Sequence, residues 1–393
     1  MDKAILLINA KGNIGGAENR YINLFNRICS FKNDYYLIIN HSLFDVYNAQ
    51  NFFLNKRHII ILELKNIAKK PFGIYRSEKT KKKTLLRKLA LITINKVKLI
   101  ITWIDFLIKM RRIIKHEKIR YIYAIWQGGI WGWVLKKIFD IKFVYSYMDA
   151  SLASLSRNPM NFLEKEYWVL KNADIIDCLS PKIASDLQDK NFFPSKQKIS
   201  VTPNSFIDYS RYYPSDEKEN LIVFLSRLNP SKNPLLFLES VVLIHELLKE
   251  LNYTVLIAGK GSETISIQDF IESHQLIRVE YIGEIFGSNQ LLSRSKIFIS
   301  IQRDNNYPSQ SLMEAMACAN AIIASDVGET RKLVTENEGV LVLLDPVEIS
   351  EAIVKLIKNE DELKKLGCNA RAKVTKEHTF EKYLEYFYSL ERI

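Results

Sequence analysis

The chain has 393 residues, 47% of them hydrophobic and 25% charged, a balance that excludes a disordered or fibrous protein and favours about two globular domains. Its formal net charge is +12. The four cysteines are widely spaced, which argues against a disulfide scaffold or a cysteine-rich zinc site and fits a reducing cytoplasm. No long apolar run with a small-residue cleavage site follows Met1, so we expect no signal peptide.

The first half of the chain alternates between short β-rich runs and helical patterns. The predicted strands are 4–9, 35–40, 58–62, 120–125, 142–148, 174–179 and 199–203. This alternation predicts an α/β domain with a mainly parallel sheet. Gly15, Gly16 and Glu18 follow the first strand, and a glycine turn before a helix lets backbone N–H groups approach an anion. The turn matches neither the dinucleotide nor the Walker A pattern, and a plain tight connection is the alternative.

One segment carries the positive excess of the chain. Residues 65–120 hold 18 basic and 3 acidic side chains, a net of +15, and the remaining residues have a net charge of −3. Nucleic acid and an anionic membrane surface are both possible partners, and the apolar content of the segment favours the membrane surface.

Residues 89–108, LALITINKVKLIITWIDFLI, are long enough to span a bilayer, but charged residues interrupt the run and argue against a transmembrane helix. Polar residues at helical spacing instead predict an amphipathic helix with one polar stripe, formed by Lys88, Asn95, Lys98, Thr102, Asp105, Lys109 and Arg112. Such a helix lies at a lipid interface or packs on the sheet of its own domain.

A second alternation begins near Asn220. Its predicted strands are 220–226, 253–259, 279–283, 297–301, 321–325 and 340–344, and the polar stretch before it, 204–219, is predicted to be a linker. Two α/β domains joined by one linker are expected to leave a cleft between them. Ligands of open α/β sheets bind outside the carboxyl ends of the strands, so chemistry is expected just after strands.

Two of these strand ends carry candidate functional residues. Arg227 and Lys232 follow strand 220–226, where an Arg can bind two phosphate oxygens and a Lys can act as a point charge on a diphosphate leaving group. The alternative is a pair of solvated cations. Glu314 lies about one and a half turns into a helix that begins near Pro308 and Ser309, where a carboxylate can accept hydrogen bonds from a ribose diol. A solvated helical glutamate is the alternative there.

Taken together, these motifs resemble those of glycosyltransferase family four, the retaining enzymes with the GT-B fold. The matching segments are GGAE (15–18), EYWVLKNADIIDCLS (166–180), VTPNSFIDYSRYYP (201–214), LSRLNPSKN (225–233), LIAGKGSE (256–263) and SLMEAMACANAIIASDVGETRKLV (311–334). The family's version of the third segment ends in Phe-x-Pro. Each motif is modest alone, but their order and spacing cover nearly the whole chain.

The resemblance implies an α/β protein with two Rossmann-like domains facing a central cleft. Residues 1–203, with the basic amphipathic segment 65–120, would bind the acceptor; 204–375 would bind the nucleotide-sugar donor; and 376–393 would form a C-terminal helix that packs back on the first domain. It also implies transfer of a sugar from a nucleotide-diphosphate sugar with retention of anomeric configuration. We expect no cofactor and no metal ion, because this fold needs no Asp-x-Asp motif and the sequence has none.

The resemblance also implies roles for individual residues. Arg227 and Lys232 would hold the donor diphosphate, and Glu314 would bind the ribose hydroxyls; we expect these three to carry catalysis. Further donor-binding positions are Gly15, Gly16, Ile285, Asn306, Ser309 and Leu312. On the acceptor side, Glu18 and Asp149 are candidates.

Three positions depart from the family pattern. The glutamate expected eight residues before Glu314 is Asn306, an amide without charge, although Asp304 is nearby. The histidine expected after the fifth strand of the first domain is missing, and the sequence there ends in Asp149. The usual Cys-Gly-x-Pro after the glutamate helix reads Cys-Ala-Asn-Ala at 318–321, a change expected to affect local backbone geometry only.

The leading hypothesis is a retaining, metal-independent hexosyltransferase on the inner face of the bacterial membrane. Its acceptor would be a lipid-linked sugar or a polysaccharide in O-antigen, lipopolysaccharide, capsule or exopolysaccharide biosynthesis. One alternative is a non-catalytic nucleotide-sugar-binding or scaffold relative, which Asn306 motivates. Another is a nucleic-acid binder, which rests only on the basic segment and lacks a known nucleic-acid-binding motif.

Overall fold

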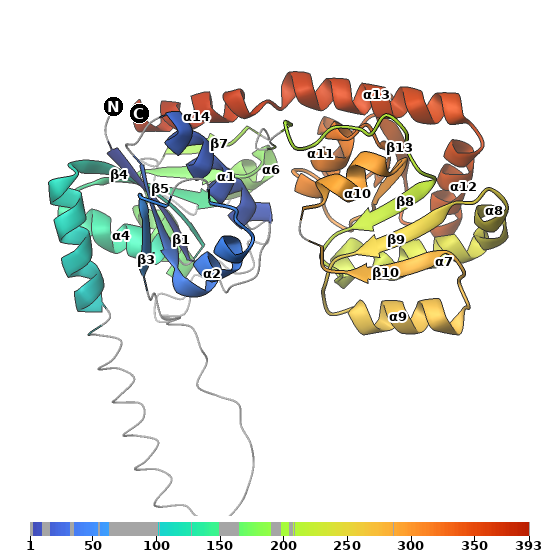
Figure 1. The fold of residues 1–393 in the computed structure, drawn as a ribbon. Helices are drawn as coiled ribbons and strands as arrows, with labels where there is room; N and C mark the ends of the chain where they lie inside the picture. Colours follow the sequence, from blue (N-terminus) through green and yellow to red (C-terminus); the bar gives the residue numbers. More distant parts are fainter. Residues whose placement is uncertain are drawn as a thin grey trace, which may run out of the picture. The chain divides into compact units, whose positions relative to one another are not determined.

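The fold is given by a computed structural model, which describes residues 3–9, 16–31, 35–53, 56–62, 101, 103–126, 128–148, 165–189, 198–203, 207, 209–285 and 287–392. The chain divides into two compact units, one made of Met1–Thr202 with Tyr386–Ile393 and the other of Pro203–Glu385. Each is a parallel β-sheet covered by helices (Figure 1). Gly15, Asp149 and most of the basic segment lie outside the described residues.

The first unit contains a seven-stranded sheet in the order β3-β2-β1-β4-β5-β6-β7. Every neighbouring pair is parallel, which confirms the predicted sheet. Its strands are β1 (Lys3–Asn9), β2 (Tyr35–Asn40), β3 (Ile59–Leu62), β4 (Ile119–Trp126), β5 (Lys142–Tyr147), β6 (Ile175–Cys178) and β7 (Lys198–Val201). Its labelled helices before the C-terminus are α1 (Gly16–Phe31), α2 (His41–Ala49), α4 (Gly128–Phe139), α5 (Lys165–Asn172) and α6 (Pro181–Asp189).

A helix over residues 103–116, drawn in teal in Figure 1, is the described part of the predicted amphipathic segment. Phe106, Met110 and Ile114 are buried in the hydrophobic core of the first unit. Their spacing of four places them on one face of the helix. For this face, packing on the sheet of its own domain is therefore the correct alternative.

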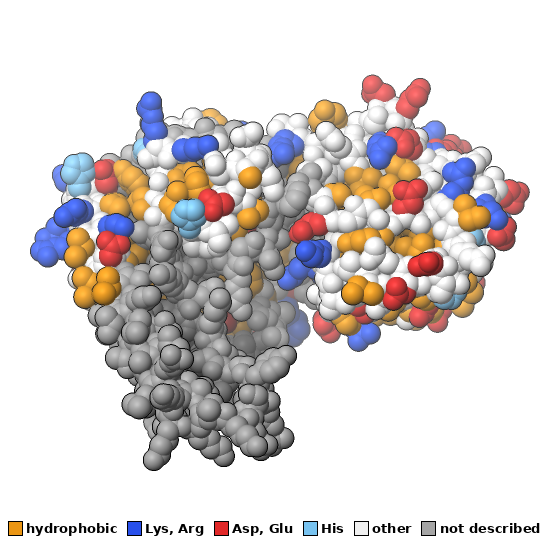
Figure 2. Space-filling model, turned by 60° about the horizontal axis from the view of Figure 1, so that its bottom comes forward, with side chains coloured by type: hydrophobic (Ala, Val, Ile, Leu, Met, Phe, Trp, Pro, Cys, Tyr) orange, Lys and Arg blue, Asp and Glu red, His pale blue; other side chains and the backbone are white. Residues whose placement is uncertain are grey.

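Another side of the same helix is exposed. Ile101, Ile104 and Ile108 are 60%, 52% and 48% exposed, and Figure 2 shows hydrophobic side chains beside Lys and Arg side chains at this edge of the unit. The predicted polar residues Asp105 and Lys109 are exposed as well and form an ion pair of 2.7 Å. The helix thus presents apolar and basic side chains to solvent at the same time.

The last helix, α14 (Phe380–Arg392), completes the core of the first unit. Tyr386 donates a hydrogen bond of 2.5 Å to the buried carboxylate of Asp177, which also accepts from the Tyr123 hydroxyl. The ring of Phe387 packs 5.2 Å from that of Tyr123 and 6.0 Å from that of Tyr35, measured between centroids. The C-terminal helix therefore packs back on the first domain, as expected.

The second unit contains a six-stranded sheet in the order β10-β9-β8-β11-β12-β13, again with all pairs parallel. The strands are β8 (Leu221–Leu225), β9 (Thr254–Ala258), β10 (Val279–Gly283), β11 (Ile297–Ser300), β12 (Ala321–Ser325) and β13 (Gly339–Val342). The helices are η2 (Pro230–Lys232), α7 (Pro234–Leu243), α8 (His245–Glu250), α9 (Thr264–Ser273), α10 (Asn289–Arg294), α11 (Gln310–Ala317), η3 (Thr330–Lys332), α12 (Pro346–Ile357) and α13 (Glu360–Glu377).

Candidate functional site

The strand order of the second unit reverses between β8 and β11, which lie side by side. β8 leads directly to Arg227 and η2, and β11 leads into the loop 301–309 and α11. In an open parallel sheet, ligands bind at the carboxyl ends of the strands where the order reverses. The candidate site is therefore built from the two segments that follow β8 and β11.

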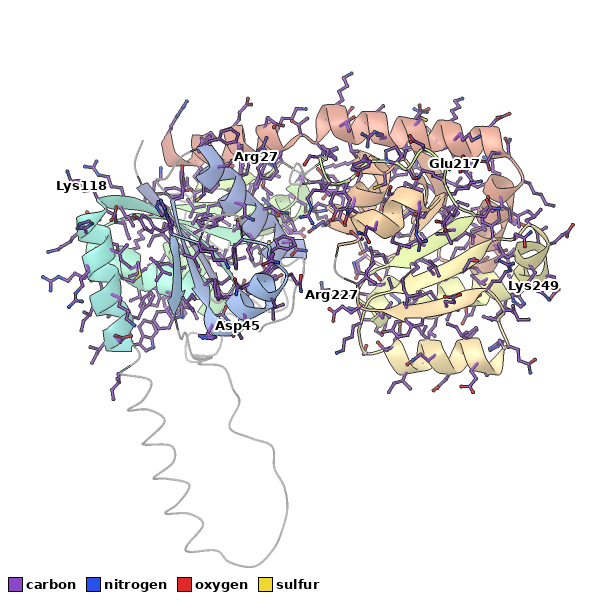
Figure 3. The ribbon with its side chains drawn as sticks, in the orientation of Figure 1. Arg27, Asp45, Lys118, Glu217, Arg227 and Lys249 are labelled. Carbon is purple, nitrogen blue, oxygen red and sulfur yellow. The ribbon has the colours of Figure 1, made fainter. Side chains whose placement is uncertain are left out.

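Arg227, labelled in Figure 3, has an exposed side chain on a loop that a glycine turn holds in place. A Cβ atom on Gly259, whose φ is +128°, would lie 1.8 Å from the carbonyl oxygen of Ser226, and one on Gly261 would lie 2.0 Å from that of Leu228. Only glycine permits such a close approach of two backbones. The Gly-x-Gly turn, found in the sequence only as a family motif, thus fixes the backbone on both sides of Arg227.

Lys232 is the last residue of η2, and its ammonium donates a hydrogen bond to Oε1 of Gln302. Burial, together with the smaller effect of the nearby charge of Arg227, lowers the pKa of Lys232 to about 8. Within the described part of the chain, no ion pair joins a carboxylate to Arg227 or Lys232. Two cations without an opposing charge make this strand end attractive to an anion.

Asn306, at the position of the missing glutamate, is only 1% exposed. Its Nδ2 donates to the carbonyl oxygen of Ser300 at 2.7 Å, and its Oδ1 accepts from the Ser300 hydroxyl at 2.9 Å and from Nε2 of Gln302. The buried amide is therefore connected to Lys232 through Gln302. Sequence reasoning did not single out Gln302, although it is the second residue after β11 and so lies where ligand-binding side chains are expected.

The helix α11 begins at the same edge of the sheet. The side chain of its N-cap, Ser309, makes no capping hydrogen bond, so the backbone N–H groups of the first turn, up to the buried Leu312, have no intrahelical partner. At the other end, Lys218 donates to the carbonyl oxygen of Cys318 at 2.7 Å and Arg371 donates to that of Ala317. These cations stabilise the negative end of the helix dipole, and the positive end remains at the candidate site.

Glu314 lies in α11 and is only 6% exposed. Its carboxylate accepts hydrogen bonds from Ser288 Oγ at 2.7 Å and from Gln310 Nε2 at 2.8 Å, and the Tyr212 hydroxyl donates in turn to Ser288 Oγ at 3.2 Å. Burial raises the pKa of Glu314, and these donors oppose the shift. The solvated alternative is therefore wrong: the carboxylate is held in place by side chains from three segments.

None of these three side chains was predicted. Tyr212 stands where the family pattern has Phe, so the hydroxyl that contacts Ser288 is a departure visible in the sequence. Ser288 directly precedes α10, and its only sequence signal is its place in the loop after β10. Ile285, in the same loop, is half-buried.

The other predicted residues belong to the first unit. Gly16 is the exposed first residue of α1, and Glu18 is buried in the first turn of the same helix. Across the described ranges, no group of three or more His, Cys, Asp or Glu side chains is arranged to hold a metal ion. None of the described helices is long and apolar enough to cross a membrane.

Residues 206–373 match the family model described as Glycosyl transferases group 1. Over 197 residues, the chain is 26% identical to the GalNAc-alpha-(1->4)-GalNAc-alpha-(1->3)-diNAcBac-PP-undecaprenol alpha-1,4-N-acetyl-D-galactosaminyltransferase of Campylobacter jejuni, a match that covers 50% of this chain and 54% of the relative. It is also 25% identical over 278 residues to an uncharacterized glycosyltransferase of Methanocaldococcus jannaschii, covering 69% and 75% of the two chains. The chain thus spans about half the length of the Campylobacter relative.

A solved structure is similar over the whole chain. The Anabaena protein HepE in complex with UDP and glucose has a TM-score of 0.72 and 16% sequence identity, and the match covers 100% of both chains. At that identity the similarity establishes the fold. The chain therefore has the GT-B fold, and its residues 206–373 match the glycosyl transferases group 1 family.

Proposed function

We propose that the protein is a retaining glycosyltransferase that takes a sugar from a nucleotide-diphosphate sugar without the help of a metal ion. The observation that carries the proposal is the pair of cations, Arg227 and Lys232, at the point where the strand order reverses. A diphosphate gains negative charge as the bond to the sugar breaks. Cations held in place before that step lower the barrier without further reorganisation.

The remaining parts of the site fit the same ligand. Arg227 can bind two phosphate oxygens at once, and the N–H groups at the start of α11 can bind others. Each carboxylate oxygen of Glu314 keeps acceptor capacity beyond its present hydrogen bonds, which suits a ribose diol. We expect an oxocarbenium-like transition state in which the departing phosphate takes the acceptor proton on the same face, and that geometry gives retention.

The relatives support a uridine nucleotide and a lipid-linked acceptor. HepE is described with bound UDP and glucose, and the name of the Campylobacter enzyme gives an undecaprenol-diphosphate-linked sugar as its substrate. We propose a similar acceptor class here, in the assembly of a bacterial surface polysaccharide at the inner face of the membrane. A lipid-linked acceptor lies in the plane of the bilayer, so the enzyme must work at that surface.

The exposed side of helix 103–116 is the surface that we propose for this contact. Its isoleucines can enter the boundary between headgroups and acyl chains, while neighbouring basic side chains remain at anionic headgroups. Exposed basic residues follow toward the end of the helix, in the turn after it and at the start of β4: Lys109, Arg111, Arg112, Lys115, Lys118 and Arg120.

Changing Ile104 and Ile108 together to Asp is expected to weaken binding to vesicles containing anionic lipid by about tenfold or more, because each loses apolar burial and adds like-charge repulsion. Vesicle cosedimentation measures the effect. The matched control is Ile265→Asp with Ile277→Asp, since these residues are 71% and 61% exposed in the second unit. Equal binding by both double variants would contradict a membrane role for this helix.

A thermal-shift screen against nucleotide-diphosphate sugars tests the proposed donor. A donor at 100 times its dissociation constant is expected to add about 2.7 kcal/mol to the free energy of unfolding. The donor that stabilises the protein is then used in a transfer assay with a lipid-linked acceptor, with and without a chelator. If no donor in a broad panel stabilises the protein, the proposed function fails.

The second candidate is a non-catalytic protein that binds a nucleotide sugar. The buried amide of Asn306, which stands in place of a carboxylate, favours it. Such a protein would respond in the thermal-shift screen but would neither hydrolyse nor transfer the sugar at any enzyme concentration. Turnover above the uncatalysed rate excludes this candidate.

A further inference from the structure

A chain of hydrogen bonds with a fixed direction runs from the backbone of β11 to Lys232. The carbonyl oxygen of Ser300 can only accept, so the side chain of Asn306 must present Nδ2 to it and Oδ1 to the other side. That oxygen then requires the Nε2 donor of Gln302. The remaining end of the Gln302 amide, Oε1, must therefore face the ammonium of Lys232.

This arrangement holds a cation without neutralising it. A lysine side chain has four rotatable bonds, and fixing it costs conformational entropy that an acceptor hydrogen bond offsets. A carboxylate at position 302 would also fix the ammonium, but it would cancel the charge and repel a phosphate. A glutamine amide supplies the acceptor and leaves the positive charge available.

We propose that Gln302 is a positioning residue that holds the Lys232 ammonium ready for the donor diphosphate, and that the buried Asn306 acts through Gln302. The proposal rests on the proposed function of the same site. It gives Asn306 an indirect role: its amide donates to the Ser300 carbonyl, which a carboxylate in the place of the expected glutamate could not do.

The electrostatic surroundings of Lys232 set the form of the test. The charged residues on the neighbouring segments are Arg227 after β8 and Arg303 and Asp304 after β11. Two more follow β9: Lys260 in the glycine turn and Glu263 directly before α9. Of these, Arg227 is the one whose charge acts on the pKa of Lys232. UDP binds best to the protonated lysine, so the affinity of the unmodified protein is expected to fall as the pH rises through about 8.

The experiment measures the dissociation constant of UDP by calorimetry from pH 6.5 to 9.5 in three variants. Gln302→Leu removes the acceptor at similar size. We expect UDP to bind about tenfold more weakly at pH 7, and the pH above which the affinity falls should be lower than in the unmodified protein. In Gln302→Glu, the added carboxylate repels the phosphate, so we expect UDP to bind more weakly at pH 7. The same carboxylate raises the pKa of Lys232, so the pH above which the affinity falls should be at least one unit higher. The control, Gln268→Leu on the exposed side of α9, is expected to match the unmodified protein.

A second measurement follows Lys232 without any ligand. The protein is labelled with 13C at the ε-carbon of lysine, the Lys232 resonance is assigned with Lys232→Arg, and its titration is recorded by NMR in each variant. A midpoint that moves up in Gln302→Glu and down in Gln302→Leu supports the proposal. An unchanged midpoint, or weaker UDP binding with an unchanged pH profile, overturns it. Movement of the midpoint in a protein that binds neither UDP nor any donor of the thermal-shift panel instead overturns the proposed function and leaves the positioning of Lys232 standing.

Discussion

Arg227→Ala is expected to lower kcat/KM for sugar transfer by about 10²–10³-fold, the loss of about 2.7–4 kcal/mol that follows removal of one preorganised donor from a developing anion. The side chain is exposed at the end of β8, so the substitution removes charge without opening a cavity. The glycine turn holds the loop through its backbone, and the thermal stability of the variant without ligand should equal that of the unmodified protein.

Two further variants separate charge from geometry. Arg227→Lys keeps the positive charge but binds only one phosphate oxygen, so its activity is expected to lie between those of the unmodified protein and Arg227→Ala. Arg278→Ala is the matched control, because Arg278 is an exposed arginine of the same unit that is bonded to Asn252 at 3.1 Å. Full transfer activity in Arg227→Ala would remove the main support for the proposed donor site.

Glu314→Gln is expected to weaken donor binding by roughly 10- to 100-fold, in line with the 1.5–3 kcal/mol of a hydrogen bond to a charged group. The carboxylate accepts from Ser288 and Gln310, and an amide offers one acceptor oxygen while directing an NH₂ group at one of these donors. Calorimetry with UDP measures the loss. Glu272→Gln, an exposed change on α9, is the control, and equal affinity in both variants would contradict the role of Glu314.

The same variant has a stability signature. Burial raises the pKa of Glu314, so the charged form is disfavoured in the folded protein relative to the unfolded chain. The free energy of unfolding of the unmodified protein should therefore fall, relative to that of Glu314→Gln, as the pH rises through the pKa range of the buried carboxyl group. Denaturant titrations from pH 4 to 8 test this sign, which an exposed glutamate would not produce.

The two sheets were predictable from sequence because each strand is a short apolar run and the connections between consecutive strands carry helical patterns. The helix at 103–116 was only partly predictable. Its periodicity identified an apolar face but not what that face packs against. In the structure, Phe106 packs against Trp131 with ring centroids 4.2 Å apart.

The residues of the candidate site were also only partly predictable from the sequence. Arg227, Lys232 and Glu314 were predicted because their positions after strands and in a helix are local features of the sequence. Gln302 was missed because its role depends on a bond to a side chain 70 residues away, and the bond from Ser288 to Glu314 spans 26 residues. Such contacts between distant segments leave no periodic signal, so only the folded structure identifies them.

The packing of α14 also sets the order in which the protein can be completed during synthesis. The first unit begins at the N-terminus, yet Tyr386 and Phe387, which belong to its core, leave the ribosome only after the whole second unit. Until then, Asp177 lacks one of its hydroxyl donors and the aromatic surface around Tyr123 is uncovered. The first unit therefore remains incomplete until the residues from Tyr386 onward, which follow the second unit in the chain, have been synthesised.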